Sequence, residues 1–84
     1  MSNITVYSKQ VCPYCVRAKA LLKRKGADFN EIMIVDEETR DEMMKKSGGR
    51  MTVPQIFIGD YHVGGYDDLE KLNRQGKLDE LLSK

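Results

Sequence analysis

Cys12-Pro13-Tyr14-Cys15 places two thiols one helical turn apart, at the point where a strand gives way to a helix. Residues 3–7 have the pattern of a short strand, and from Pro13 the apolar residues recur with the period of a helix. These apolar residues are Val16, Ala18, Leu21 and Leu22. Pro13 suits the first helical position, because its ring fixes φ near the helical value and its missing N–H would have had no acceptor. We therefore expect a helix over residues 13–25, with Cys12 at or beside its N-cap.

The start of this helix favours an anion at Cys12. The unpaired N–H groups of the first turn and the positive end of the helix dipole both stabilise negative charge. We therefore expect the pKa of Cys12 to fall from about 8.5 into the range of about 3.5–7.5 found for activated thiols. Cys15 can then close onto Cys12 as a disulfide. The alternative is a pair of core cysteines, since free cysteines often pack as small hydrophobic residues.

Length and composition limit the classes of function. The chain has 84 residues, of which 32% are charged and 40% hydrophobic, and we expect one globular domain over residues 1–84. No apolar run approaches the roughly 20 residues that cross a membrane, and the N-terminus lacks the pattern of a secretory signal. We therefore expect a soluble, cytoplasmic protein. The net charge of +1 gives no strong attraction to nucleic acid or to anionic lipid, so we expect neither as a partner.

The cysteines are better suited to redox chemistry than to bracing the fold or binding a metal. A disulfide that closes so short a loop removes little chain entropy. A structural zinc site needs four ligands, and beside the two cysteines the chain offers only the distant His62. We therefore expect no metal site, and we interpret His62 as a strand residue without a catalytic part.

The rest of the chain predicts alternating strands and helices. Strands over residues 3–7 and 28–34 with the helix between them make a βαβ unit, so these strands should be parallel. A second helix should run from Glu37 to Lys46 with Asp36 as its N-cap. Strands over residues 51–59 and 61–64 should pair antiparallel around a Gly59-Asp60 turn. A third helix should begin near Asp67, with Glu70 completing a capping box, and a short helix should follow Gly76.

This order of elements, with the cysteine pair at the first strand-to-helix junction, is that of the thioredoxin-like fold. In that α/β fold, helices flank both faces of a four-stranded mixed sheet. Over nearly its whole length the chain resembles the dithiol glutaredoxins through four separated signatures. They are Lys9 ahead of the cysteine pair, Thr52-Val53-Pro54, Gly64-Gly65, and Asp67-Asp68. Tyr66 departs from the family's usual pattern, which often has cysteine or a small residue there, and it should narrow the groove or stack on a ligand.

The resemblance implies a glutathione-dependent thiol–disulfide oxidoreductase that reduces protein disulfides and glutathione mixed disulfides. Cys12 is the attacking thiol, because it lies at the accessible helix start, and Cys15 resolves the mixed disulfide. Glutathione is the reductant and substrate. The expected partners are glutathione and disulfide-containing or glutathionylated proteins, with ribonucleotide reductase as one candidate, and we expect a monomer.

The resemblance also implies how glutathione is bound. A cis Val53–Pro54 bond would free the Val53 backbone to pair with the tripeptide, although a proline that merely starts a strand is the alternative. N–H groups near Tyr66 and Asp67 would hold the γ-glutamyl carboxylate. The residues expected to bind glutathione are Lys9, Tyr14, Thr52, Val53, Pro54, Gly65, Tyr66, Asp67 and Asp68. Lys9 is the first choice for the glycyl carboxylate, with Arg40 or Lys46 second, although a solvated lysine and ordinary capping aspartates are the alternatives.

Two rival functions stay open. Two chains could share an iron–sulfur cluster through Cys12 and two glutathione thiols, which would make the protein a cluster carrier, although Pro13 stiffens the turn against this. The protein could also serve one specific disulfide enzyme and be recycled by thioredoxin reductase. The source of reducing equivalents and the colour of the anaerobically purified protein would separate these functions.

Overall fold

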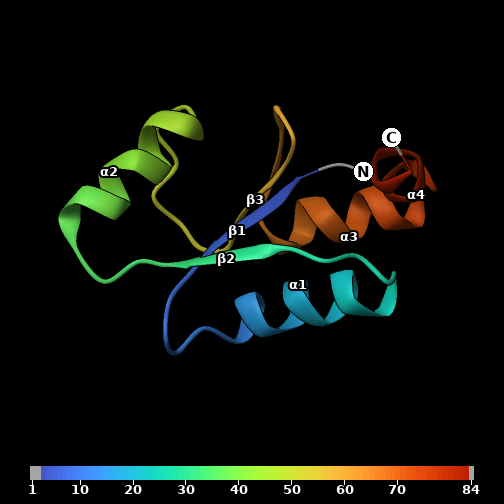
Figure 1. The fold of residues 1–84 in the computed structure, drawn as a ribbon, viewed down its shortest axis with the longest axis horizontal. Helices are drawn as coiled ribbons and strands as arrows, with labels where there is room; N and C mark the ends of the chain where they lie inside the picture. The colour runs from blue at the N-terminus through green and yellow to red at the C-terminus, as the bar shows by residue number, and fades with distance from the viewer. Residues whose placement is uncertain (1–2, 84) are drawn as a thin grey trace.

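The computed structural model describes residues 3–83 and builds them around a four-stranded sheet with the strand order β2-β1-β3-β4 (Figure 1). The strands are β1 (Ile4–Ser8), β2 (Asn30–Met33), β3 (Gln55–Ile58) and β4 (Tyr61–Gly64). β1 pairs parallel with β2 and antiparallel with β3, and β3 pairs antiparallel with β4. The parallel βαβ unit and the later antiparallel hairpin that the sequence predicts are both confirmed.

Helices cover both faces of this sheet. They are α1 (Pro13–Arg24), α2 (Glu37–Lys46), α3 (Tyr66–Arg74) and α4 (Lys77–Leu82). Figure 1 shows α2 on one side of the strands, with α1 and α3 on the other side and α4 following α3. The predicted thioredoxin-like fold, a mixed sheet flanked on both faces, is confirmed. None of the helices within residues 3–83 combines the length and the apolar character needed to cross a membrane.

Each face of the sheet has its own core, because successive side chains of a strand point to opposite faces. Val6 and Ile56 lie in the larger core, which they share with α1, α3 and α4. Tyr7 and Phe57, the next residues along each strand, pack with Met43 of α2 on the other face. The strand that leads to Cys12, β1, is thus held between two packed layers.

Val16 does not take the inward place that the apolar pattern suggests. Its side chain is 61% exposed, whereas Cys15 is only 1% exposed and faces the core. Cys15, Ala18 and Leu22 follow the i, i+3, i+7 spacing of one helix face, and Val16 falls outside it. Cys15 is therefore part of the packed face of α1.

Several predicted boundaries differ from those in the structure, and two of the differences have a local reason. β3 begins at Gln55 rather than at residue 51, because Pro54 has no N–H to donate to a neighbouring strand. α3 begins at Tyr66, one residue earlier than predicted, with Gly65 as its N-cap. The capping contact runs from the Gly65 N–H to the Asp68 carboxylate at 2.9 Å, in place of the predicted pair of Asp67 and Glu70.

Candidate functional site

The two cysteines lie at the start of α1 and are joined as a disulfide, with their Cα atoms 5.2 Å apart. Cys12 is the N-cap residue, as the sequence predicts, and its backbone is extended with φ at −151°. The backbone N–H of Cys15 donates to the Cys12 sulfur at 3.2 Å. This hydrogen bond comes from the unpaired N–H groups of the first helical turn, so it would favour a thiolate at Cys12 once the disulfide is reduced.

The two sulfur-bearing residues differ in their surroundings. Cys12 is partly exposed, whereas Cys15 is buried in the packed face of α1. A buried thiol in apolar surroundings resists ionisation, and it cannot be reached by a bulky disulfide. The exposed cap position of Cys12 argues against the alternative of two core cysteines, and it makes Cys12 the thiol that a substrate can reach.

A groove of about 320 Å³ lies beside Cys12, which is near the lower end of the size range of small-molecule sites. It is lined by Tyr14, Arg50, Thr52, Val53, Pro54, Gly65, Tyr66, Asp67 and Asp68. The Cys12 sulfur lies 3.9 Å from the Val53 carbonyl oxygen, so the reactive atom adjoins this groove. Apart from Lys9, every residue that the sequence assigns to glutathione binding lines the groove.

The loop before β3 forms the side of the groove nearest to Cys12. The Val53–Pro54 peptide bond is cis, as the family resemblance implies. Residues 52–54 precede β3, and Val53 is only partly buried. The backbone of Val53 therefore lies just before the first residue of β3, with its carbonyl oxygen next to the Cys12 sulfur.

The start of α3 forms the other side of the groove and adds a residue that the sequence analysis missed. The Asp68 carboxylate accepts the N–H of Gly65 at 2.9 Å and a guanidinium N–H of Arg50 at 3.3 Å. Gly64 has φ at +111°, and a Cβ added there would lie 2.7 Å from the Arg50 guanidinium. The positive φ and the crowding by these side chains both favour glycine at position 64. The one feature of the sequence that could have pointed to Arg50 is its position, two residues before Thr52 of the predicted binding loop.

Two tyrosines form an aromatic wall along the groove. The rings of Tyr14 and Tyr66 stack at 6.2 Å with 30° between their planes, and the Arg17 guanidinium lies 5.5 Å from the Tyr14 ring centre. A side-chain hydrogen bond with Glu70 raises the pKa of Tyr66 above its usual value. Tyr66 thus joins α3 to the start of α1 and occupies space that a smaller residue would leave open.

The three cations proposed for the glycyl carboxylate lie outside this groove. Lys9 and Arg40 line a separate hollow of about 250 Å³ beside the start of α2. Lys46 lies at the end of α2, with its ammonium 5.9 Å from the ring centre of Tyr7. Arg50 is the cation that lines the groove within the described part of the chain. The role of Lys9 stays a prediction.

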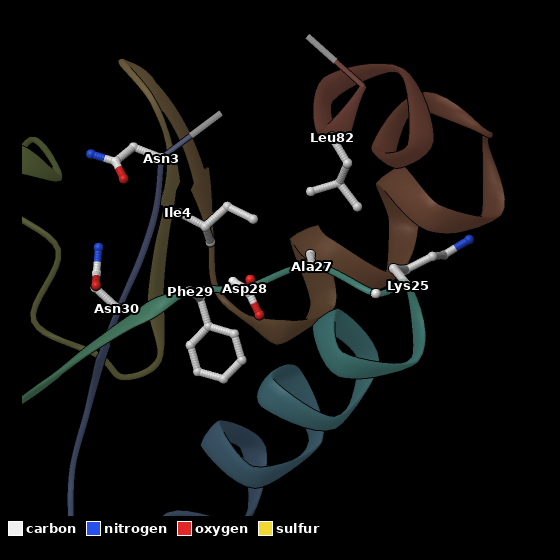
Figure 2. Close-up of a pocket in the computed structure, with 9 residues that line it drawn as sticks. Asn3, Ile4, Lys25, Ala27, Asp28, Phe29, Asn30 and Leu82 are labelled. Atoms are coloured by element: carbon white, nitrogen blue, oxygen red, sulfur yellow. The ribbon is translucent and has the colours of Figure 1, made fainter. Parts of the chain in front are cut away.

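Another hollow, of about 350 Å³, lies away from the cysteines. Figure 2 shows three of its lining residues, Ile4 on β1, Phe29 in the loop before β2 and Leu82 on α4, while the Lys25 side chain extends away from them. Neither cysteine lines this hollow, so it offers no redox chemistry. Within residues 3–83, no group of three or more His, Cys, Asp or Glu side chains is arranged to hold a metal ion.

The chain is similar in sequence and structure to several known proteins. A family model described as glutaredoxin matches residues 4–63. A glutaredoxin of Pseudomonas aeruginosa is 55% identical over 84 residues, and the match covers 99% of each chain. Glutaredoxin 3 of Escherichia coli K12 is 52% identical over 82 residues, and the match covers 98% of this chain and 99% of that protein. A crystal structure of a buckwheat glutaredoxin–glutathione complex matches with a TM-score of 0.87 at 32% identity, covering 98% of this chain and 77% of that one. The two bacterial relatives span the cysteine pair, the cis-proline loop and the start of α3.

Proposed function

Because this chain belongs to the glutaredoxin family and is therefore a thiol–disulfide oxidoreductase, we propose that it uses glutathione to reduce protein disulfides and glutathione mixed disulfides. The observation that carries the proposal is the groove beside Cys12, which adjoins the reactive sulfur at the Val53 carbonyl. The buckwheat relative, whose structure is a complex with glutathione, supports the same ligand. Thiols that cycle between two states work where glutathione keeps the surroundings reducing, so we propose a cytoplasmic setting.

Cys12 begins the reaction as a thiolate that attacks one sulfur of the substrate disulfide. A bond forms between Cys12 and that sulfur, and the other substrate sulfur leaves as a thiolate that takes up a proton. Cys15 then attacks the Cys12 sulfur, which releases the second substrate thiol and closes the Cys12–Cys15 disulfide. This is the state in which the two cysteines are found in the structure. Two electrons have then passed from the dithiol to the substrate.

Glutathione returns the dithiol to its reduced state in two exchanges. One glutathione thiolate attacks Cys12, which frees Cys15 and leaves a mixed disulfide on Cys12. A second glutathione thiolate attacks the glutathione sulfur of that mixed disulfide, which yields glutathione disulfide and the Cys12 thiolate. When the substrate is itself a glutathione mixed disulfide, Cys12 takes the glutathionyl group directly, and the step that needs Cys15 is bypassed.

The groove, together with the loop before Cys12, offers a partner for each part of the tripeptide. The Val53 backbone can pair with the cysteinyl residue as a strand would, which brings its sulfur to Cys12. The N–H groups that open α3 suit the γ-glutamyl carboxylate, and the exposed Asp67 carboxylate suits the ammonium beside it. The Tyr14–Tyr66 wall packs along the tripeptide. We assign the glycyl carboxylate to Lys9, in the exposed loop three residues before Cys12.

The test of this function compares two sources of electrons. Turnover of a glutathionylated peptide should proceed with glutathione, glutathione reductase and NADPH, and should fail with thioredoxin reductase and NADPH. Turnover only with thioredoxin reductase would reject the proposal. Asp67→Asn should raise the KM for the glutathionylated peptide about five- to tenfold, because a charge-assisted hydrogen bond is lost. Asp60→Asn, a matched change in the β3–β4 turn outside the groove, should leave that KM unchanged.

A further inference from the structure

We propose that His62 is a positioning residue for the glutathione-binding loop and that it acts through the side chain of Gln55. His62 lies on β4 and does not line the groove, whereas Thr52 and Val53 do. Gln55, the first residue of β3, is hydrogen bonded to both His62 and Thr52. This inference rests on the proposed function, because it concerns the loop assigned to glutathione.

The orientation of the Gln55 amide follows from its partners. Gln55 is completely buried, so each polar atom of its side chain needs a hydrogen-bond partner inside the protein. Its amide nitrogen lies 3.0 Å from the Thr52 carbonyl oxygen and 3.2 Å from the Thr52 hydroxyl. A carbonyl oxygen can only accept, so the nitrogen faces Thr52 and the amide oxygen faces β4.

The amide oxygen of Gln55 in turn fixes the tautomer of His62. It lies 2.7 Å from Nε2 of His62, and because an amide oxygen can only accept, Nε2 must carry the proton. The imidazole is held flat against Phe57, with ring centres 4.8 Å apart and 23° between the planes. Burial, and secondarily the positive charge of Arg50, lowers the pKa of His62, so the ring is neutral near pH 7.

This series of hydrogen bonds ends at Thr52, which is next to Val53, the residue beside the Cys12 sulfur. Thr52 and Val53 lie before β3, outside the ladder of the sheet, and Gln55 binds both the carbonyl and the hydroxyl of Thr52. The carbonyl oxygen of Val53 is 3.9 Å from the Cys12 sulfur. The hydrogen bond from His62 therefore helps to set where glutathione is presented to Cys12.

Two substitutions at position 62 test this role. His62→Phe keeps an aromatic ring against Phe57 but removes the donor to Gln55, whereas His62→Gln places an amide N–H near the position of Nε2. His62→Phe should raise the KM for a glutathionylated peptide about fivefold, as expected for the loss of one buried hydrogen bond, with kcat within about twofold. His62→Gln should restore the KM. The rate at which iodoacetamide alkylates Cys12 should be the same in all three proteins, because the start of α1 is untouched.

A second measurement separates this proposal from the proposed function. The ¹⁵N order parameters of Thr52 and Val53, recorded on the reduced protein without glutathione, should fall in His62→Phe and recover in His62→Gln. An unchanged KM in His62→Phe, a failure of His62→Gln to restore it, or unchanged order parameters would each overturn the role of His62. Wild-type protein that shows no glutathione-dependent turnover would overturn the proposed function instead, while a response of the order parameters would still support the positioning of the loop by His62.

Discussion

The starts of α1 and α2 share one capping pattern but differ in their chemistry. Cys12 caps α1 with its sulfur, which accepts the N–H of Cys15 at 3.2 Å, and Asp36 caps α2 with a carboxylate oxygen, which accepts the N–H of Thr39 at 2.8 Å. Both cap residues are extended, with φ at −151° and −146°. In each helix, the cap binds the N–H three residues further along.

The difference between the two caps lies in the ordinary pKa of the capping group. The hydrogen bond from the Thr39 N–H lowers the pKa of Asp36 below its usual 3.8, so this carboxylate stays charged at neutral pH. A thiol ordinarily ionises at about 8.5, so we expect the same kind of stabilisation to lower the pKa of the Cys12 thiol toward the physiological range. One arrangement of backbone therefore anchors a helix when the cap is a carboxylate, and it prepares a nucleophile when the cap is a thiol.

The largest effect is expected when the capping sulfur of α1 is replaced by oxygen, which gives α1 and α2 the same kind of capping atom. Cys12→Ser keeps an oxygen that can cap the helix, so the fold should persist, but a hydroxyl cannot exchange with a disulfide. Glutathione-coupled turnover should fall by at least about a thousandfold. Asp36→Ser is the matched control, since it also exchanges a cap for serine, and it should leave turnover within about twofold. Activity in Cys12→Ser above about 1% of wild type would show that another group attacks the disulfide.

The next prediction separates the backbone of Cys15 from its side chain. Cys15→Ser keeps the N–H that stabilises the Cys12 sulfur but removes the resolving thiol. Deglutathionylation of a peptide should stay within about threefold of wild type, because glutathione itself completes that reaction. Reduction of a protein disulfide should be lost, because the mixed disulfide with Cys12 is no longer resolved internally. Parallel assays with the two substrates measure this split, and equal loss of both activities would contradict it.

A third prediction extends the comparison to α3, whose cap has no side chain. Gly64→Ala forces a left-handed φ on alanine and pushes its Cβ against the Asp68 carboxylate and the Arg50 guanidinium, so the free energy of unfolding should fall by about 1–3 kcal/mol. Gly65→Ala is the matched control, since its Cβ would lie in ordinary contact, 3.6 Å from the Pro54 carbonyl oxygen. Urea unfolding should show little change in Gly65→Ala. Equal destabilisation by the two substitutions would mean that the space around Gly64 does not decide the cost.

Short-range signals explain why both caps could be predicted from sequence. Pro13 after Cys12, and two acidic residues after Asp36, act within one turn of each helix start, and the structure confirms both N-caps. The start of α3 was predicted one residue late, because Gly65 has no capping side chain and Asp68 supplies the contact from inside the helix. The signals were reliable where the cap residue itself carries the polar atom.

Contacts between distant residues could not be predicted in the same way. Arg50 reaches Asp68 across 18 residues, and Gln55 joins His62 to Thr52 only once β3 and β4 are paired. No periodicity marks such contacts, because they depend on how the hairpin and the loop before it are packed. The family resemblance supplied the cis bond before Pro54 and the set of residues that line the groove, but neither Arg50 nor the part played by Gln55.

The smallest effect is expected from removing the carboxylate cap of α2, and it should depend on pH. The pKa of Asp36 is lower in the folded protein than in the unfolded chain, so the stabilisation by its carboxylate is present above the unfolded pKa and is lost as pH falls through the folded pKa. Asp36→Ala should therefore lower the urea midpoint at pH 7. The difference in urea midpoint between this variant and wild type should become smaller below about pH 3. Asp41→Ala, on the same helix, is the control. Turnover at pH 7 should be unchanged in both variants, because α2 carries no reacting atom. If the urea midpoints of Asp36→Ala and wild type differed by the same amount at every pH, the charge of Asp36 would contribute nothing to its cap.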